Sequence, residues 1–416
     1  MEEYLEPFAY ADEKSRFGPI EKVHLFWYAG MSCDGCTVAV TGAQAPTLEG
    51  LMMGAHPGLP RVVLHHPVVN LESGPAFERA AEQAIKGELD GPFVVVLEGS
   101  IADETIAHAQ GGYWAGQGEE PWGPDGAHRT VTAEEWIARL APNSAAMIAI
   151  GTCATWGGIP AAAGNPTGAM SLMDFLGQDY RSTFGVPVVN VPGCPPIGDN
   201  FMEAVAAIVY FLQGFGPLPE FDELGRPAWQ FGETVHRHCV RGAYYEEGVY
   251  AKEFGDKECL VEIGCWGPVV NCNITSRGAI GHVGGCMNSG GACIGCTMPG
   301  FPDKFTPFYT TAPGSKVSTT MSRMVGSFIR PLRAYSNANL NREVRWDVEG
   351  HVPSGWAREE SEPGPVRDLG HKFYDVLRRS NDRSKNKGET WGKGSELTLA
   401  QNPELEQQLP GADDSR

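Results

Sequence analysis

Four cysteine positions constrain the fold of this chain more than any other feature of its sequence. Each follows a short apolar run that predicts a buried strand: Cys33 and Cys36 follow Val23–Tyr28, Cys153 follows Ala145–Ile150, and Cys194 follows Val186–Val191. In an open sheet of parallel strands, the carboxyl ends of the strands meet at one crevice, where ligands bind. We therefore expect these four thiols to converge although they are far apart in the sequence.

The rest of the N-terminal half alternates strand and helix patterns. This alternation favours an α/β fold with a flavodoxin-like, doubly wound parallel sheet. Two more apolar runs, Val62–Val69 and Phe93–Leu97, predict strands, and Ala76–Leu89 has helical spacing. Thr132-Ala-Glu-Glu135 is typical of a capping box at the start of a helix. Asp199 is expected to cap an apolar helix that ends near Gln213.

The composition changes after about residue 216. Residues 236–305 contain seven cysteines, many glycines and little periodicity, which predicts a loop-rich region held together by what its cysteines bind. We expect three parts: a flavodoxin-like domain at 1–216, a loop-rich domain with little regular structure at 217–355, and a polar extension at 356–416. For the segment Ser380–Arg416, which is poor in apolar clusters, a solvated tail is favoured over an arm that wraps a partner.

Charge and cysteine content exclude several classes of protein. The chain of 416 residues has a formal net charge of −19, so it lacks the basic surface that nucleic-acid binding requires. Its longest apolar run, Ala204–Leu212, is too short to span a bilayer, and no twin-arginine pair precedes Val23. Eleven cysteines without an export signal favour metal binding over disulfides. We expect a cytoplasmic protein, associated with a membrane at most peripherally through a partner.

The cysteines, with one histidine, form three sets that predict metal ligands. The first is Cys33, Cys36, Cys153 and Cys194; the second is His236, Cys239, Cys259 and Cys265; the third is Cys272, Cys286, Cys293 and Cys296. Thiolate sites of this kind suit zinc or an iron–sulfur cluster, and a histidine ligand is compatible with both. The Cys33/Cys36 pair alone also fits a redox dithiol. Because the sets use all eleven cysteines, a chain of electron-transfer clusters explains them better than separate structural zinc ions.

Six motifs in order along residues 20–305 resemble the small, electron-transferring subunit of nickel–iron hydrogenases. They are Cys33-Asp-Gly-Cys36, Glu98-Gly-Ser100, Gly151-Thr-Cys153, Pro192-Gly-Cys194-Pro-Pro196, His236-x-x-Cys239 and Cys293-Ile-Gly-Cys296. The earlier motifs are shared with the cluster-bearing small subunit of respiratory complex I, which lacks the histidine set. The resemblance implies an oxidoreductase subunit in hydrogen oxidation, active only with a large subunit that holds the nickel–iron centre.

The resemblance also implies a place for each set. The first set falls on the proximal cluster, the second on the distal cluster facing the acceptor, and Cys272, Cys293 and Cys296 on the medial cluster between them. The acceptor, a quinone or a small redox carrier, is left open, and a higher oligomer of heterodimers is expected. An electron-transfer subunit of another redox complex and a zinc-stapled scaffold remain alternatives.

The chain departs from the family pattern at two positions. One departure points to the oxygen-tolerant, high-affinity actinobacterial-type subgroup, and the other changes the ligands available to the medial cluster. That subgroup is known for an aspartate ligand to the proximal cluster, and Asp34 is the candidate, most plausibly in place of Cys33. Cys286 occupies the medial position that is usually proline, so a fourth thiolate is available there. We therefore expect three iron–sulfur clusters, all of the [4Fe–4S] type.

Overall fold

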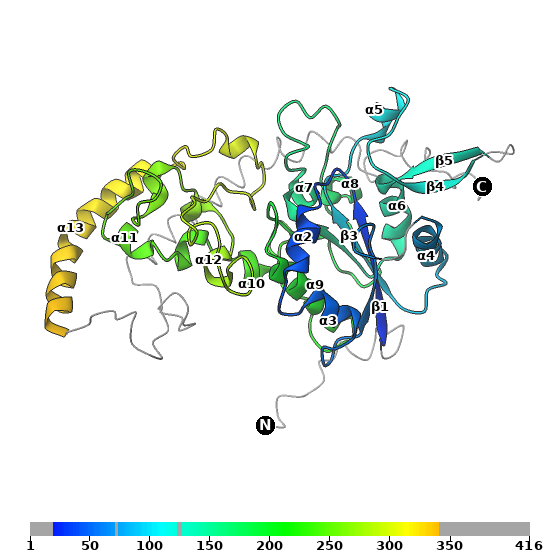
Figure 1. Ribbon diagram of the computed structural model, residues 1–416, viewed down its shortest axis with the longest axis horizontal. Helices are drawn as coiled ribbons and strands as arrows, with labels where there is room; N and C mark the ends of the chain where they lie inside the picture. Colours follow the sequence, from blue (N-terminus) through cyan, green and yellow to red (C-terminus); the bar gives the residue numbers. More distant parts are fainter. Residues whose placement is uncertain (1–19, 71–73, 123–126, 341–416) are drawn as a thin grey trace. The chain divides into compact units, whose positions relative to one another are not determined.

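The computed structural model describes residues 20–70, 74–122 and 127–340, which divide into two compact units (Figure 1). Among these residues, the first unit contains those up to Gln230 together with Cys296–Asp303. The second unit contains Phe231–Gly295 and the residues from Lys304 onward. The polar extension expected at 356–416 lies outside the described residues.

A parallel sheet of five strands forms the centre of the first unit. Its strands lie in the order β2-β1-β3-β6-β7, and every pair of neighbours is parallel. This is the strand order of flavodoxin-like folds, which confirms the expected fold class. The strands are β1 (Lys22–Ala29), β2 (Arg61–His65), β3 (Phe93–Glu98), β6 (Ala146–Ile150) and β7 (Val189–Val191).

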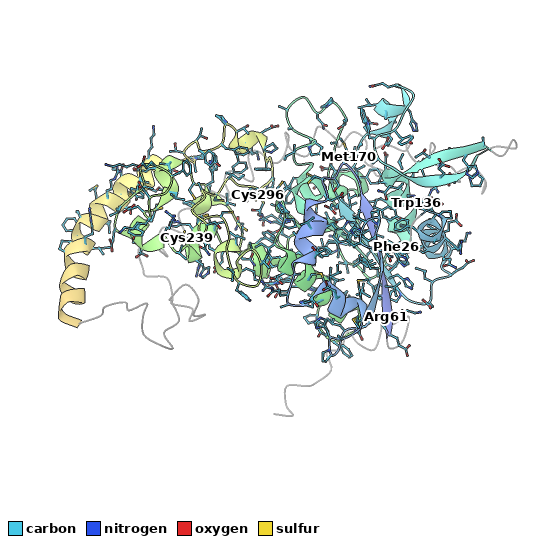
Figure 2. All side chains as sticks on the ribbon, in the orientation of Figure 1. Phe26, Arg61, Trp136, Met170, Cys239 and Cys296 are labelled. Carbon is cyan, nitrogen blue, oxygen red and sulfur yellow. The ribbon has the colours of Figure 1, made fainter. Side chains whose placement is uncertain are left out.

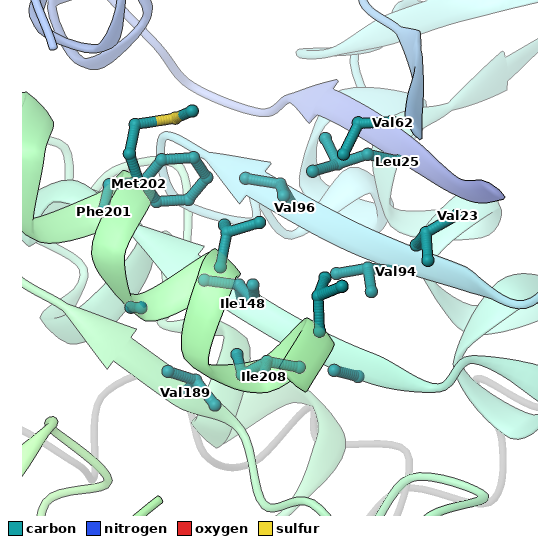
Figure 3. Packing of buried hydrophobic residues seen from close by; sticks show 14 of the residues in the cluster. Val23, Leu25, Val62, Val94, Val96, Ile148, Val189, Phe201, Met202 and Ile208 are labelled. Atoms are coloured by element: carbon teal, nitrogen blue, oxygen red, sulfur yellow. The ribbon is translucent and has the colours of Figure 1, made fainter. Parts of the chain in front are cut away.

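Helices cover both faces of this sheet, and a hydrophobic cluster fills each interface. One face carries α2 (Gly35–Thr41), α3 (Leu48–Met52) and α9 (Gly198–Leu212); the other carries α4 (Pro75–Lys86), α6 (Ala133–Leu140) and α8 (Leu172–Leu176). Figure 3 shows Phe201, Met202 and Ile208 of α9 over the strand residues of the first face. Phe26 and Trp136 belong to the cluster on the second face (Figure 2). The strands are buried on both sides because helices cover both sides.

An antiparallel hairpin and short helices complete the first unit. The hairpin was not expected from the sequence, since residues 116–121 read GQGEEP, a polar stretch with two glycines and a proline. These elements are β4 (Gly116–Trp122), β5 (Ala127–Thr132), α5 (Glu104–His108), η1 (Ala141–Asn143) and α7 (Gly151–Trp156), while α10 (Ala228–Phe231) begins in the first unit and ends in the second.

Most expected elements of the first unit are confirmed, and prolines explain two shorter strands. The run predicted over Val62–Val69 ends as a strand at His65, because Pro67 lacks the N–H that a ladder needs. The run predicted over Val186–Val191 is a strand only at Val189–Val191, after Pro187. The capping box is confirmed, since the Thr132 side chain and Glu135 bond each other's backbone at the start of α6.

The prediction that Asp199 caps α9 is wrong. Asp199 lies inside the helix, and the capping position is Ile197, which makes no side-chain cap. The Asp199 carboxylate instead accepts hydrogen bonds from the backbone N–H groups of Gln44 (2.7 Å) and Ala45 (3.0 Å). A tertiary contact with the loop after α2 therefore uses the oxygen that a local cap would need.

The second unit contains mainly short helices joined by loops, in agreement with the sequence. A long helix, α13, was not expected. The elements of the described part are η2 (Val235–His238), α11 (Gly242–Glu246), η3 (Leu260–Ile263), η4 (Gly267–Val269), α12 (Ile274–Arg277) and α13 (Ser315–Leu340), while η5 (Asp303–Phe305) begins in the first unit and ends in the second. Among the helices of the described residues, none is long and apolar enough to cross a bilayer.

Candidate metal centres

The first cysteine set lies at the carboxyl ends of the sheet. Cys36 is the second residue of α2, which follows β1, Cys153 lies in α7 directly after β6, and Cys194 follows β7. Cys36 lies near enough to Cys33, Cys153 and Cys194 for their charges to raise its pKa, although burial is the larger cause. The parallel sheet therefore brings these four thiols to one place.

The turns that carry the first set require glycine. Gly151 begins α7 with a φ of +84°, and a Cβ there would lie 2.4 Å from the Cys36 sulfur. A Cβ on Gly158 would lie 2.8 Å from the Cys153 sulfur, also at a positive φ. A side chain at either position would collide with a thiol, so these two glycines let the backbone approach the sulfurs.

Glu98 joins the loops of the first set from the end of β3. Its carboxylate is almost fully buried and accepts hydrogen bonds from the backbone N–H groups of Cys36 (3.0 Å) and Thr37 (3.2 Å). It also accepts from the Trp27 indole N–H (3.0 Å). Glu98 thus serves as the cap of α2, a helix whose own N-cap residue, Asp34, makes no side-chain bond.

Asp34 is exposed and lies in the left-handed region, with a φ of 59°. Its backbone N–H donates to the Ser32 hydroxyl at 3.0 Å. Cys33 is one of the groups whose charges raise the pKa values of Cys36 and Cys153.

The second set lines a cavity in the second unit. His236 lies in η2, Cys239 follows η2 and precedes α11 (Figure 2), and Cys259 and Cys265 flank η3; all four line the cavity. His236, Cys259 and Cys265 are buried. Burial raises the pKa of the Cys259 thiol, the charges of Cys265 and Cys239 raise it further, and the guanidinium of Arg241 lowers it.

Backbone N–H groups point at two sulfurs of the second set. The Arg241 N–H donates to the Cys239 sulfur at 3.4 Å, and the Cys293 N–H donates to the Cys265 sulfur at 3.3 Å. Such bonds favour a thiolate over a thiol, so these sulfurs are suited to act as metal ligands.

The third set is divided between the two units. Within the second unit Cys293 is buried, Cys272 is half-buried and Cys286 is exposed, whereas Cys296 belongs to the first unit. There the carbonyl of Cys296 accepts a hydrogen bond from the Thr152 hydroxyl in α7. The charge of Cys286 also contributes to the raised pKa of Cys265, a residue of the second set.

The donor chemistry of the first two sets fits an iron–sulfur cluster. Burial and neighbouring thiols raise the pKa of Cys153 and of Cys265 to about 11 each, so both are thiols at neutral pH unless a cation is present. Metal binding replaces such protons, because a coordinated thiol is deprotonated. Within the described ranges, no three His, Cys, Asp or Glu side chains lie close enough together to hold a single metal ion.

Glu98 was noted in the sequence only as part of a motif, and its role was not predicted. A charged residue directly after the apolar run Phe93–Leu97 is the signal that could have indicated it. The hydrogen bonds that Arg241 and Cys293 donate through their backbone carry no sequence signal.

Comparison with known protein families gives two matches along the chain. Residues 33–208 match the model described as NADH ubiquinone oxidoreductase, 20 Kd subunit. Residues 231–309 match the model that describes the C-terminal part of the NiFe/NiFeSe hydrogenase small subunit.

Individual relatives match about two thirds of the chain. The periplasmic [NiFeSe] hydrogenase small subunit of Desulfomicrobium baculatum is 34% identical over 292 residues, which cover 70% of this chain and 87% of that protein. The hydrogenase-2 small chain of Escherichia coli K12 is 33% identical over 287 residues, 66% of this chain and 67% of that one. Among solved structures, an actinobacterial-type NiFe-hydrogenase from Ralstonia eutropha H16 aligns with a TM-score of 0.74 and 46% identity, over 82% of this chain and 97% of that chain.

Proposed function

Because the chain belongs to the nickel–iron hydrogenase small-subunit family and is an electron-transferring subunit of that kind, we propose that it conducts electrons through three iron–sulfur clusters. The electrons come from the nickel–iron site of a large subunit, where hydrogen is oxidised. The observation that carries this proposal is the convergence of four thiols at the carboxyl edge of the parallel sheet.

We propose ligands for each cluster in this chain. Cys36, Cys153 and Cys194, with Cys33 or Asp34, hold the proximal cluster; the grouping of Cys33 with the other thiols supports Cys33, and the family pattern supports Asp34. His236, Cys239, Cys259 and Cys265 hold the distal cluster, supported by the cavity that they line. Cys272, Cys286, Cys293 and Cys296 hold the medial cluster, and four thiolates there favour [4Fe–4S] at that site. Since the other two sets also offer four ligands each, we propose [4Fe–4S] at all three sites.

The residues of this chain position and tune the clusters. Each cluster, when bound, takes up and releases one electron at a time. Glu98 and the glycine turns hold the proximal loops close together, and the N–H groups of Arg241 and Cys293 compensate the charge on two distal sulfurs. Charge and hydrogen bonds at the sulfurs are the terms by which a protein sets the potential of a cluster.

Metal analysis of the purified complex tests this function. We expect nickel in a large partner, together with iron and acid-labile sulfide that correspond to three four-iron clusters, and a brown protein. Stoichiometric zinc in a colourless chain would support a zinc-stapled scaffold instead. Clusters without nickel or a large partner would point to a different redox complex.

We also propose that two such heterodimers associate through α13 of the second unit. Its packed face carries small buried residues, Ser315, Thr319 and Ser322. Its opposite face carries four exposed apolar side chains spaced by four, three and four positions: Val317, Met321, Met324 and Phe328. An exposed apolar row of this spacing is typical of a seam between two helices.

A second copy of this chain is the occupant that the neighbouring residues favour. The positions beside the row, 318, 320, 325 and 327, are Ser, Thr, Val and Ser, so two copies meet without like charges in contact. We expect the double substitution Met321→Glu with Met324→Glu to reduce the complex to one small and one large subunit by light scattering. Lys316→Glu, which adds a carboxylate away from the row, is the control. An unchanged mass for the double variant would contradict this association.

We propose that electrons leave at the distal set to a quinone or a small redox carrier, and that the protein is cytoplasmic. None of the eleven cysteines, all of which lie in the described ranges, forms a disulfide, as expected in a reducing compartment. The rate at which the complex reduces a soluble quinone, compared with the rate for a protein carrier, tests the acceptor. Fractionation of cells tests the location.

A further inference from the structure

A chain of hydrogen bonds runs from His66 to the loop of the first cysteine set. The Nε2 atom of His66 lies 3.0 Å from the Thr37 hydroxyl, and that hydroxyl lies 2.5 Å from Oε2 of Glu98. The other carboxylate oxygen of Glu98 accepts from the Cys36 N–H at 3.0 Å. His66, Thr37 and Glu98 are all buried, and they come from three different parts of the sheet unit.

Backbone N–H groups, whose protons are fixed, determine which atom donates in each of these hydrogen bonds. The backbone N–H groups of Val68 (3.0 Å) and Val69 (3.2 Å) donate to Nδ1 of His66, so Nδ1 carries no proton. The neutral imidazole therefore carries its proton on Nε2 and donates it to the Thr37 oxygen. The Thr37 hydroxyl is then left to donate its own proton to Glu98.

The surroundings of His66 keep the ring neutral and in place. Burial lowers the pKa of His66 to about 4. The ring lies 4.9 Å from that of Trp27, and Trp27 also donates to the Glu98 carboxylate. Apolar side chains, among them Leu64 and Phe201, line the cavity beside it, and they offer His66 no competing polar partner. Thr37 is thus held from one side by His66 and from the other by Glu98.

We propose that His66 and Thr37 are positioning residues for the proximal cluster: they fix the Glu98 carboxylate against the Cys36 loop and compensate part of its charge. This inference rests on the proposed function, in which the first set holds a cluster. Glu98 lies close enough to raise the pKa of Cys36 through its charge. A change in how far hydrogen bonds compensate the Glu98 charge therefore changes the electrostatic potential at Cys36. Fewer donors to the carboxylate leave more negative charge beside the cluster, which makes addition of an electron less favourable.

The experiment is an EPR-monitored redox titration of the intact complex. Thr37→Val keeps the shape of the side chain but removes both hydrogen bonds, and we expect it to lower the midpoint potential of the proximal cluster. Thr37→Ser keeps the hydroxyl and should restore the wild-type potential. Thr41→Val is the matched control, because Thr41 lies on the same helix, is exposed and bonds only the carbonyl of Val38 among the hydrogen bonds of the described residues. The medial and distal clusters are internal references that should not move.

A second variant tests the histidine. His66→Phe keeps a ring beside Trp27 without a donor, and we expect a shift of the same sign as that of Thr37→Val. Since both act through one chain of bonds, the double variant should shift less than the sum of the two single shifts. If His66→Phe does not fold, the comparison of Thr37→Val with Thr37→Ser decides alone.

The outcomes separate this inference from the proposed function. A wild-type complex without iron–sulfur signals contradicts the function. Normal clusters with an unshifted proximal potential in Thr37→Val overturn the positioning role while the function stands. A loss of iron or of thermal stability with unchanged potentials assigns Thr37 a structural role only, and this also overturns the inference.

Discussion

The two units of this protein are built by different physical means, although both carry cysteines that we propose as cluster ligands. The first has a five-stranded sheet with a hydrophobic cluster on each face. In the second, one buried cluster consists of Tyr250, Cys259 and Val261, with Tyr244 and Tyr245 packed against it, and one of these residues is a proposed ligand. A sheet with two cores can position side chains without metal, whereas we expect a unit of short helices, in which a proposed ligand is part of a buried cluster, to depend on its metal.

Removal of iron should therefore destabilise the second unit much more than the first, and this is the largest effect that we expect. Binding free energy of a structural metal is folding free energy, on the order of 10 kcal/mol in small zinc domains. Chain produced without cluster assembly should lose amide protection over Phe231–Gly295 while β1, β3 and β6 keep theirs, as measured by hydrogen exchange. Equal loss of protection in both units would show that the sheet also depends on metal.

A core substitution should have the reverse pattern. Phe201 of α9 is buried against the sheet (Figure 3). Its ring makes an edge contact with that of Trp27. Phe201→Ala is expected to destabilise the first unit by about 3–5 kcal/mol, through lost burial and the cavity that remains. Thermal unfolding should shift down, while the EPR spectrum of the distal cluster in the folded complex is unchanged. Phe215→Ala, at an exposed phenylalanine of the same unit, is the control.

The two units should also differ in their response to pH. In α8 of the first unit, burial raises the pKa of Asp174 from 3.8 to about 7. Its neutral form is favoured in the folded state, so its stabilising contribution is complete below pH 3.8 and is lost as pH rises towards 7. At about 1.4 kcal/mol per pKa unit, the loss is a few kcal/mol. Acid has the opposite effect on metal ligands, because protons compete with the metal.

Asp174→Asn should remove this dependence, since the amide keeps an oxygen that can accept from the Ser171 hydroxyl (2.8 Å) and has no charge to bury. Compared with wild type, the variant should gain unfolding free energy as pH rises from 4 to 7, measured by denaturant unfolding of the first unit. A difference that stays constant over this range would mean that Asp174 is ionised in the folded protein.

The contrast between the units explains how much could be predicted. The strands of the first unit were predictable because apolar runs such as Phe93–Leu97 report burial on both faces directly. Convergence of the four cysteines followed from parallel topology alone. Local reasoning failed where a distant partner decides: Asp199 bonds Gln44 and Ala45, which lie some 150 positions away in the sequence.

For the second unit the sequence predicted a loop-rich region with cysteine ligands, but not its individual contacts. Glycine-rich loops have no periodicity from which to read a contact, so the hydrogen bonds to the sulfurs of Cys239 and Cys265 could not be foreseen. The helix α13 was missed for another reason. Its packed face is made of serine, threonine and glycine, and its apolar row faces outward, so its pattern is the inverse of an ordinary surface helix.

Helix caps extend the comparison to the smallest effect that we expect. In the first unit the side chains of Thr47, Asp103, Thr132 and Ser171 cap α3, α5, α6 and α8, while the N-cap residues of α2, α4, α7 and α9 make no side-chain cap. In the second unit η2, α11, η3 and α12 all begin without one. The Thr132 oxygen accepts from the Glu135 N–H at 3.3 Å, and Glu135 returns a bond to the Thr132 N–H. Thr132→Ala removes one acceptor and leaves a buried N–H without its partner, so it should cost about 1 kcal/mol. Thr132→Ser keeps the cap and should be close to wild type.

Because α6 packs on the sheet and not on a metal site, the loss of stability in Thr132→Ala should be the same with and without iron when the unfolding of the first unit is followed by hydrogen exchange in β3 and β6. A loss that depends on iron would mean that the core of the first unit and the clusters are thermodynamically coupled, and the two units would then no longer be separate in stability.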